Sequence, residues 1–260
     1  MTTLKNDSIK KYWDKQARKR GHLKNATVRD WYLRDLEVET TQKYLKKSDT
    51  VIDIGCGNGG PTLQLSSFVK HIVGVDFSEM LIQEAIKLSN KKRVKNIEFL
   101  CANALSLPFQ NESFDKAIMS RVLINIPSQR LKNKAIREAI RILKKNGTFI
   151  LLESTLQGHR FTDGVRKKFR LERLKKHWHN VYVDEKYMNN YLKRNFTIED
   201  THRFSMYMFI SKILHPLIVY PEEPQFLSKI NKVASEISKE ILEIENLPIG
   251  HNLMWVLKKK

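Results

Sequence analysis

The chain contains 260 residues, with 47 Lys or Arg and 28 Asp or Glu, so its formal net charge is +19. Its hydrophobic content of 41% suffices for a packed core and excludes a disordered chain. No apolar run reaches the roughly 18–20 residues of a membrane span, the N-terminus lacks the apolar region of a secretory signal, and two cysteines are too few for a disulfide framework or a zinc cluster. We therefore expect a cytoplasmic, reduced protein that has no membrane span and no metal.

The first fifty residues have the pattern of two helices. Apolar residues recur at helical spacing from Ile9 to Ala17, and Gly21 breaks the run. A second helical pattern, over residues 28–45, places aromatic and aliphatic residues among charged ones. We expect residues 1–47 to form a helical N-terminal cap.

Strands and helices are expected to alternate from residue 48 to residue 155. Short apolar runs are separated by segments with helical periodicity and by glycine- or proline-containing loops. Such alternation indicates parallel βαβ units in a doubly wound α/β sheet. The expected strands are Thr50–Ile54, His71–Val75, Ile97–Cys101, Phe114–Ser120 and Thr148–Glu153, and the expected helices are Pro61–Val69, Ser78–Leu88 and Ser128–Leu143.

Residues 156–260 interrupt this alternation. The pattern predicts a basic helix over Phe161–His177 and two last strands over Phe196–Phe204 and Asn252–Leu257. A largely helical insertion, with a loop from His215 to Pro224, lies between those strands. The two last strands would join those of residues 48–155 in one seven-stranded sheet of a Rossmann-like domain. The C-terminal insertions of this domain would lie on the substrate side.

The most informative stretch is VIDIGCGNGG, residues 51–60. A strand ends in glycines and a helix begins, which places free backbone N–H groups and a positive helix end at the carboxyl edge of the sheet. The glycines fit the GxGxxG pattern of dinucleotide-binding proteins, which is weak evidence by itself. Asp53 argues against NAD, because a carboxylate at the strand end would repel a pyrophosphate. It would instead attract the ammonium group of S-adenosylmethionine.

Four segments occur together in the order and spacing of one known family, over about residues 48–155. They are VIDIGCGNGG, GVDFSEMLIQEA, CANALSLPF with SFDKAIMSRVLINI, and RILKKNGTFILLES. In these segments the chain resembles the class I S-adenosylmethionine-dependent methyltransferases. The wider chain, with VRDWYLRDLEVET and HWHN, more loosely resembles bacterial small-molecule methyltransferases of surface-polysaccharide and natural-product pathways.

The resemblance implies roles for individual residues at the cofactor. Asp76, which ends the second strand, would accept hydrogen bonds from the two ribose hydroxyls. Asn103 stands where the family often has an Asp that contacts the adenine amino group, and its amide oxygen can still accept that bond. The full set expected to bind S-adenosylmethionine is Tyr12, Trp13, Arg34, Asp53, Gly55, Cys56, Gly57, Asn58, Asp76, Phe77, Met80, Asn103, Ala104 and Ser120.

The residues after the fourth strand bear on the acceptor atom. Residues 120–123, SRVL, lack the (Asp/Asn/Ser)-Pro-Pro-(Tyr/Phe) motif of enzymes that methylate exocyclic nitrogens of DNA bases. The sequence also has no cysteine pair suited to C5 methylation, so oxygen is the leading acceptor atom by elimination. Arg121 would hold the cofactor carboxylate or the substrate. The candidate bases are His159, His177, His179 and Tyr182, of which the His177-Trp178-His179-Asn180 cluster is favoured.

The positive charge is densest after the fifth strand. Residues 158–180 contain eight Lys or Arg and two Asp or Glu, a net charge of +6, which suits an anionic partner. We expect O-methylation of a small polar, anionic acceptor that is phosphorylated, nucleotide-linked or a sugar. Methylation of tRNA or rRNA is the alternative, although the chain has no appended RNA-binding module. A merely solvated helix face and a cofactor-binding protein without turnover also remain open.

Overall fold

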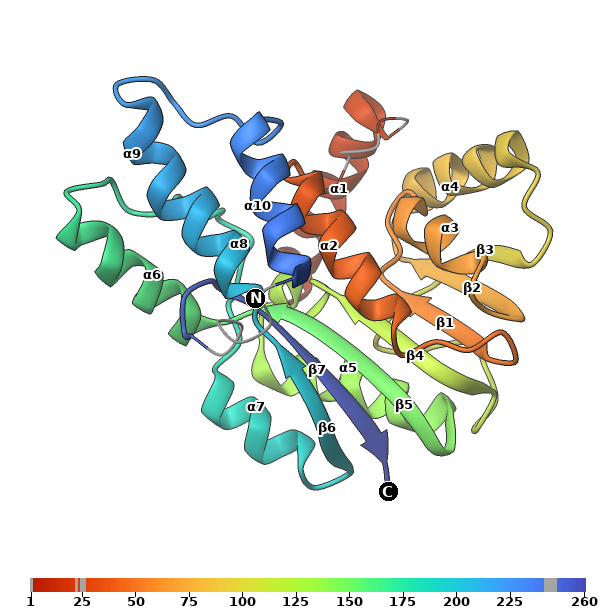
Figure 1. Ribbon diagram of the computed structural model, residues 1–260. Helices are drawn as coiled ribbons and strands as arrows, with labels where there is room; N and C mark the ends of the chain where they lie inside the picture. Colours follow the sequence, from red (N-terminus) through yellow and green to blue (C-terminus); the bar gives the residue numbers. More distant parts are fainter. Residues whose placement is uncertain (1, 22, 24–26, 241–246) are drawn as a thin grey trace.

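The computed structural model describes residues 2–21, 23, 27–240 and 247–260. Within these residues seven strands form one sheet in the spatial order β3-β2-β1-β4-β5-β7-β6 (Figure 1). Strands β1 to β5 are parallel, and β7 runs antiparallel to both of its neighbours. The bounds are β1 Thr50–Ile54, β2 His71–Asp76, β3 Ile97–Cys101, β4 Phe114–Ser120, β5 Leu143–Ser154, β6 Phe196–His202 and β7 Asn252–Lys259.

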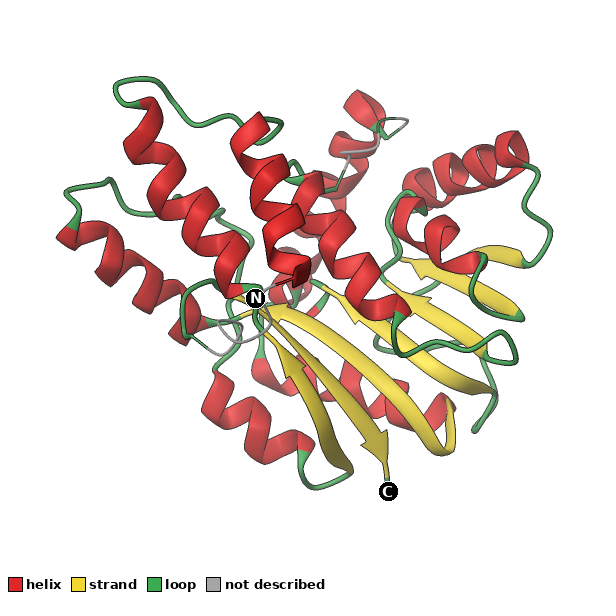
Figure 2. Cartoon of the chain, in the orientation of Figure 1, coloured by secondary structure: helices red, strands yellow, loops and turns green. Residues whose placement is uncertain are grey.

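Helices pack against both faces of this sheet (Figure 2). Buried side chains of α5 and α7 belong to the core on one face, and those of α2, α3, α8 and α10 belong to the core on the other. The bounds are α1 Thr2–Arg20, α2 Trp31–Gln42, α3 Gly60–Ser66, α4 Glu79–Lys92, α5 Gln129–Ile142, α6 Leu156–Lys168, α7 Glu185–Leu192, α8 Ser205–Phe209, α9 His215–Val219 and α10 Lys229–Glu240, with a 3-10 turn at Leu123–Asn125 and a π-helical turn at Ile210–Leu214.

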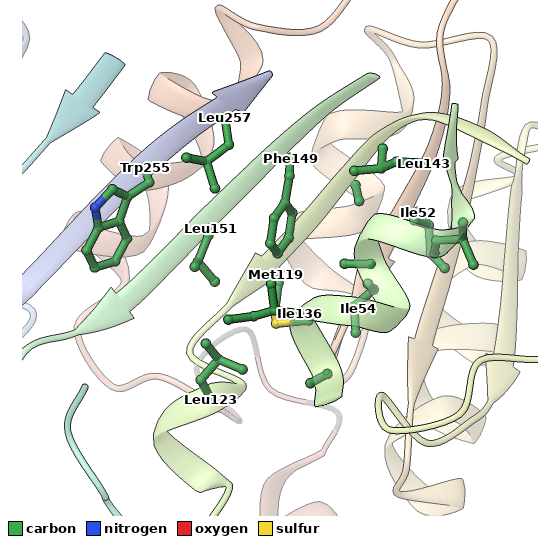
Figure 3. Close-up of a cluster of buried hydrophobic side chains, with 14 of the residues drawn as sticks. Ile52, Ile54, Met119, Leu123, Ile136, Leu143, Phe149, Leu151, Trp255 and Leu257 are labelled. Atoms are coloured by element: carbon green, nitrogen blue, oxygen red, sulfur yellow. The ribbon is translucent and has the colours of Figure 1, made fainter. Parts of the chain in front are cut away.

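Alternate residues of each central strand enter different cores. Ile52 and Leu151 face the core that contains α5 and α7, whereas Val51 and Ile150 face the opposite core, as the two-residue period of a strand requires. Figure 3 shows the first of these cores, where Trp255 of the last strand joins side chains of the parallel strands. Because both faces are covered, apolar residues occur at successive positions of the central strands, as in Val51-Ile52 and Phe149–Leu152.

The expected seven-stranded, Rossmann-like α/β sheet is confirmed. Its strands come both from residues 48–155 and from residues 156–260, which therefore share one sheet. Strand β5 begins at Leu143, five residues before the expected start at Thr148. The earlier start reflects an irregularity in the pairing of β4 with β5, where Phe114 pairs with Leu143 and Lys116 pairs with Thr148, so that the extra residues lie in β5.

The expected basic helix over residues 161–177 is wrong in both bounds. Helix α6 begins earlier, at Leu156, where Thr155 accepts a hydrogen bond from the Gly158 N–H, and it ends at Lys168. The chain then folds back, and two side chains of α6 hold the returning backbone. Asp163 accepts the Leu174 N–H at 2.9 Å, and the Arg166 Nε donates to the Glu172 carbonyl at 2.6 Å.

The expected loop over residues 215–224 is also partly wrong, because its first five residues form α9. Pro216 lies in the first turn of α9, a position that tolerates proline. The helix ends at Val219, just before the Tyr220–Pro221 pair. A residue that precedes proline is disfavoured in the helical conformation, which accounts for this end.

The carboxyl ends of the five parallel strands meet at one edge of the sheet, the edge at which ligands bind in doubly wound folds. The segments that cross this edge are α1, α2, α6, the helices from α8 to α9, and residues 172–182. None of the helices that the structure describes is long and apolar enough to cross a membrane.

Candidate functional site

The glycine loop after β1 adopts a conformation that requires glycine. Gly55 and Gly57 have φ angles of 79° and 58°, in the left-handed region that residues with a Cβ rarely occupy. A Cβ on Gly55 would lie 2.2 Å from the Val122 Cγ2 atom. The Gly55 N–H donates to the Val75 carbonyl at 2.7 Å, which fixes the loop to the end of β2. The loop therefore brings its backbone against the space at the sheet edge.

Asp76 connects this loop to β2. Its carboxylate accepts the Gly57 N–H at 3.0 Å and the Ser78 N–H at 2.9 Å, and only 7% of the residue is exposed. Burial raises the pKa of Asp76 to about 6, although the two backbone hydrogen bonds favour the charged form. The carboxylate lines the main cavity, where it can accept further hydrogen bonds.

That cavity has a volume of about 1060 Å³, at the upper end of the range of about 300–1,000 Å³ that is usual for ligand pockets. It extends from the glycine loop and β2 to α6, the π-helical turn and α9. It therefore has room for two molecules side by side. The expected site residues that line it are Tyr12, Trp13, Arg34, Gly55, Gly57, Asp76, Phe77, Asn103, Ala104, Ser120, Arg121, His177 and His179.

Four residues expected at the cofactor are not part of the main cavity wall. Asp53 is buried on β1 and accepts the Thr62 hydroxyl at 2.6 Å, and its burial raises its pKa. Cys56 is also buried, which raises the pKa of its thiol. The Asn58 amide donates to the carbonyls of residues 21 and 23 at 2.8 and 3.0 Å, and the Met80 sulfur accepts the Arg18 Nε at 3.4 Å. Asn58 and Met80 thus attach the N-terminal cap to the sheet edge.

Two partly buried arginines meet beside the end of β4. The Arg34 Nη1 donates to the Ser120 hydroxyl at 3.2 Å, and its Nε lies 3.9 Å from the Glu37 carboxylate. The Arg121 Nη2 donates to the Oε2 of Glu37, and the Asn252 Nδ2 donates to the Oε1 of the same carboxylate at 2.8 Å. Burial, with a further contribution from Arg121, lowers the pKa of Arg34 to about 10. The Glu37 carboxylate is thus shared by two guanidinium groups, and Asp53 and Asp35 also act electrostatically on Arg34.

The favoured histidine cluster lies against the N-terminal cap. The ring of His179, 4% exposed, packs 4.4 Å from Tyr12 and 5.8 Å from Trp13, centroid to centroid. The ring of His177 stacks on it at 5.6 Å. Burial lowers the pKa of His179 to about 4, with His177 as a further cause, so this imidazole is neutral at pH 7.

Two buried charged side chains, those of Glu153 and Lys132, bind backbone segments near these histidines. Glu153, at the end of β5, accepts the N–H groups of Leu123 and Ile124 at 2.5 and 3.1 Å, and its burial raises its pKa to about 7. Lys132 of α5 donates to the Val181 carbonyl at 2.5 Å, and its burial lowers its pKa to about 8. The turn after β4 and the segment around residue 181 are therefore anchored from the core side.

A second ring cluster lines the same cavity. The rings of His159 and Tyr182 are 4.7 Å apart, and His251 lies 6.3 Å from each of them. The sequence pattern had indicated the first two as candidates but not His251. Burial lowers the pKa of His251 to about 3, with contributions from Lys212, His159 and Arg121. His251 reaches the site because its carbonyl accepts the Thr155 N–H at 2.6 Å, next to the pairing of β5 with β7.

Polar atoms without partners point to a polar ligand. In the part of the chain that the structure describes, five buried side-chain nitrogen or oxygen atoms have no hydrogen-bond partner. All five belong to residues that line the main cavity, and such groups are costly to leave unpaired. Nothing in the sequence pattern distinguished Ser211 or His251 from ordinary packing residues. The five atoms are the Arg121 Nε, the Nδ1 atoms of His159, His179 and His251, and the Ser211 Oγ.

The basic segment contributes to the site only in part. Arg166, Arg173 and Lys175 line the cavity, whereas Lys167 and Arg170 do not and are exposed. Arg166 also donates to the Lys212 carbonyl, which ties α6 to the π-helical turn. Among the described residues, no group of three or more His, Cys, Asp or Glu side chains is arranged to hold a metal ion.

Residues 45–208 match a family model whose description is methyltransferase domain. The chain belongs to this family. Its members are class I S-adenosylmethionine-dependent methyltransferases, so the resemblance in the sequence is confirmed, and S-adenosylmethionine is the family's cofactor. The residues present fit that cofactor, because Gly55 and Gly57, which have no side chains, line the cavity together with the buried Asp76.

Two curated relatives are similar over part of their length. The chain is 37% identical over 142 residues to an uncharacterized protein of Methanocaldococcus jannaschii, and the aligned region covers 55% of this chain and 50% of that protein. It is 34% identical over 109 residues to demethylmenaquinone methyltransferase of Lactococcus lactis, and this aligned region covers 41% of this chain and 42% of that protein. The chain thus spans about half, or less, of the length of these relatives.

A solved structure extends the likeness in fold to the whole chain. It is Haemonchus contortus phosphoethanolamine N-methyltransferase 1 in complex with phosphoethanolamine and S-adenosylhomocysteine. The TM-score is 0.67 at 17% identity, and the match covers 100% of this chain and 50% of that one.

Proposed function

We propose that this protein transfers a methyl group from S-adenosylmethionine to an oxygen atom of a small, polar, anionic molecule. The observation that carries the proposal is the main cavity, which joins the glycine loop and Asp76 to a compartment lined by unpaired polar atoms and by arginine and lysine side chains. When bound, S-adenosylmethionine supplies an electrophilic methyl group on a sulfonium.

The cofactor half of the proposed site is formed by the glycine loop and the ends of β2 and β3. Asp76 would accept hydrogen bonds from the ribose hydroxyls, and Phe77 and Ala104 would contact the adenine. Asn103 already uses its Oδ1 to accept the Leu105 N–H at 2.9 Å. Its NH₂ group is therefore the better candidate for a bond to an adenine ring nitrogen.

The charge of the acceptor is inferred from the arginine pair. Among the described residues, the Arg121 Nε is buried and has no hydrogen-bond partner. A carboxylate or phosphate oxygen of the acceptor would accept this hydrogen bond. Arg121 would thereby orient the acceptor next to the methyl group.

Proton removal is assigned to the histidine pair. His179 is neutral at pH 7, so its imidazole can accept a hydrogen bond from an acceptor hydroxyl and orient it. A base with so low a pKa holds a proton only briefly. The exposed ring of His177 beside it would take up the proton through bridging water and release it to solvent. The cap residues Tyr12 and Trp13 pack against the ring of His179 and limit its access to bulk water.

A small molecule is favoured over RNA as the acceptor. His179 and the unpaired atoms are buried, so an acceptor must enter the cavity to reach them. The two relatives described above whose names state an acceptor are a demethylmenaquinone methyltransferase and a phosphoethanolamine N-methyltransferase, and both names state a small molecule. The surface-polysaccharide or natural-product pathway inferred from the sequence stays a prediction.

The test is a panel of acceptors assayed with methyl-labelled S-adenosylmethionine. The panel contains phosphorylated alcohols, hydroxy acids, nucleotide sugars, their uncharged analogues, and total tRNA. Labelling of an anionic hydroxyl compound, lost in Arg121→Gln and absent with the uncharged analogue, supports the proposal. Labelling of tRNA alone contradicts it.

A further inference from the structure

Large apolar side chains are exposed around the end of α9. Ile218 is 66% exposed and Tyr220 is 81% exposed. Three more large apolar residues between positions 217 and 227 are also exposed. We call this set the apolar tip, and it consists of Leu217, Ile218, Tyr220, Phe226 and Leu227. Scattered exposed apolar residues are normal, whereas a group of them within eleven residues marks an interaction surface.

An exposed basic segment lies beside the apolar tip. We call it the basic strip, and it consists of Lys167, Lys168, Arg170, Arg173, Lys175 and Lys176, all exposed. Phe169, within the strip, is 47% exposed. The strip begins on the last turn of α6, where the neighbouring Arg166 side chain donates to the Lys212 carbonyl of the π-helical turn that leads into α9.

The tip and the strip border the same opening. Arg173 and Lys175 of the strip line the main cavity together with Phe226 of the tip and with Pro216 and Pro224, which flank tip residues in the sequence. Figure 1 shows the ends of α6 and α9 on the same side of the molecule, away from α4. The rim of the cavity is therefore basic on one part and apolar on another.

We propose that the apolar tip and the basic strip together dock the protein on an anionic membrane surface. Basic residues are attracted to anionic headgroups, and adjacent aliphatic and aromatic side chains insert at the boundary between headgroups and acyl chains. The six cations of the strip outnumber the exposed carboxylates nearby, those of Glu172, Glu222 and Glu223. The rim of the cavity then faces the headgroup layer.

The composition of the surface distinguishes a membrane from other occupants. RNA would use the basic strip and aromatic rings but has no need of the aliphatic side chains of Leu217, Ile218 and Leu227. A second copy of the chain would place one basic strip near another, and like charges repel. An anionic bilayer satisfies both kinds of side chain at once.

Sedimentation with sucrose-loaded vesicles tests the proposal. We expect the protein to bind vesicles that contain phosphatidylglycerol and phosphatidylcholine, and to bind pure phosphatidylcholine vesicles at least fivefold more weakly. The double variant Ile218→Ser/Tyr220→Ser should reduce binding at least fivefold, and so should Lys167→Gln/Lys168→Gln/Arg170→Gln. Ile86→Ser is the matched control, because Ile86 is 40% exposed on α4, away from the tip, and it should bind like the unaltered protein. Calorimetry with S-adenosylhomocysteine checks that each variant is folded.

Three outcomes overturn the proposal. The first is that the unaltered protein does not bind the anionic vesicles. The second is that the Ile218→Ser/Tyr220→Ser variant binds the anionic vesicles with the same affinity as the unaltered protein does. The basic strip would then act alone, as a nucleic-acid surface would. The third is that sedimentation velocity shows a dimer that these two substitutions dissociate, because the tip then belongs to a contact between copies. None of these outcomes depends on the proposed acceptor or on methyl transfer.

Discussion

Glu37 of α2 forms a buried ion pair with Arg121, the residue that follows β4. The same carboxylate accepts a hydrogen bond from Asn252 at the start of β7 and lies near Arg34. One side chain thus connects the N-terminal cap, the end of the fourth strand and the last strand. The connection sets the position of both guanidinium groups at the cavity wall.

Glu37→Gln should therefore lower the free energy of unfolding by about 3 kcal/mol, the usual cost of removing one partner of a buried ion pair. Inorganic phosphate should restore part of the loss, since an anion can replace the missing charge. Glu39→Gln on the same helix is the control. Glu39 forms an exposed pair with Lys239 at 2.7 Å, and its loss should cost at most about 1 kcal/mol. Urea unfolding measures both, and equal effects would contradict the account of the arginine pair.

The histidine pair should matter for turnover and not for cofactor affinity. We expect His177→Ala and His179→Ala to lower kcat by about 10²–10⁴-fold, the usual contribution of a general base, with little change in the affinity for S-adenosylhomocysteine. His71→Ala on β2, which does not line the cavity, should leave both quantities unchanged. Full turnover in both site variants would remove the pair from the mechanism.

Cations that line the cavity should affect the KM for the acceptor more than cations outside the cavity do. Arg173→Gln/Lys175→Gln should raise the acceptor's KM, with a larger increase at low salt because salt screens exposed charges. Lys167→Gln/Lys168→Gln removes two charges from the same segment but not from the cavity wall, so its KM should change much less. Steady-state kinetics with any acceptor found in the panel measures both. Equal effects would mean that the charge acts only at long range.

His251 should make the protein sensitive to acid. Its pKa in the folded protein is about 3, against about 6.5 for an unperturbed histidine. Between these values the unfolded chain binds a proton that the folded chain does not, so stability falls as the pH is lowered, by about 1.4 kcal/mol per unit. His251→Gln should reduce the loss of stability between pH 7.5 and pH 5 by about 2 kcal/mol, measured by urea unfolding at both values. An unchanged difference would show that His251 is not held neutral.

The sequence predicted the elements whose signal is local. The strands from β1 to β4 are apolar runs bounded by glycine, proline or charged residues, and their expected bounds agree with the structure to within a residue. The glycine loop was also predicted, because its glycines occur together with Asp53 and with the segments that follow in the order of one family. These features need no knowledge of the rest of the chain.

Features that depend on distant contacts could not be predicted. The end of α6 is set by Asp163 and Arg166, which bind the backbone of the returning chain, and helical periodicity continues past it. His251 is 72 residues from His179 in the sequence and reaches the cavity only through the pairing of β7 with β5. The prediction that Asp53 contacts the cofactor stays a prediction, and the hydrogen bond from Thr62 to its carboxylate was not visible in the sequence pattern.

Calorimetry with S-adenosylhomocysteine, on the unaltered protein and on Asp76→Asn, tests the central claim most directly. Asp76 has a pKa of about 6, and its charged form is the better acceptor for the ribose hydroxyls. We expect one binding site whose affinity falls as the pH is lowered from 7 to 5. In Asp76→Asn the affinity should be weaker by about 1.5–3 kcal/mol, the usual value of hydrogen bonds to a charged group, and nearly independent of pH. Binding of NADH with no response to S-adenosylhomocysteine, or an unaltered affinity in the folded Asp76→Asn variant, would contradict it.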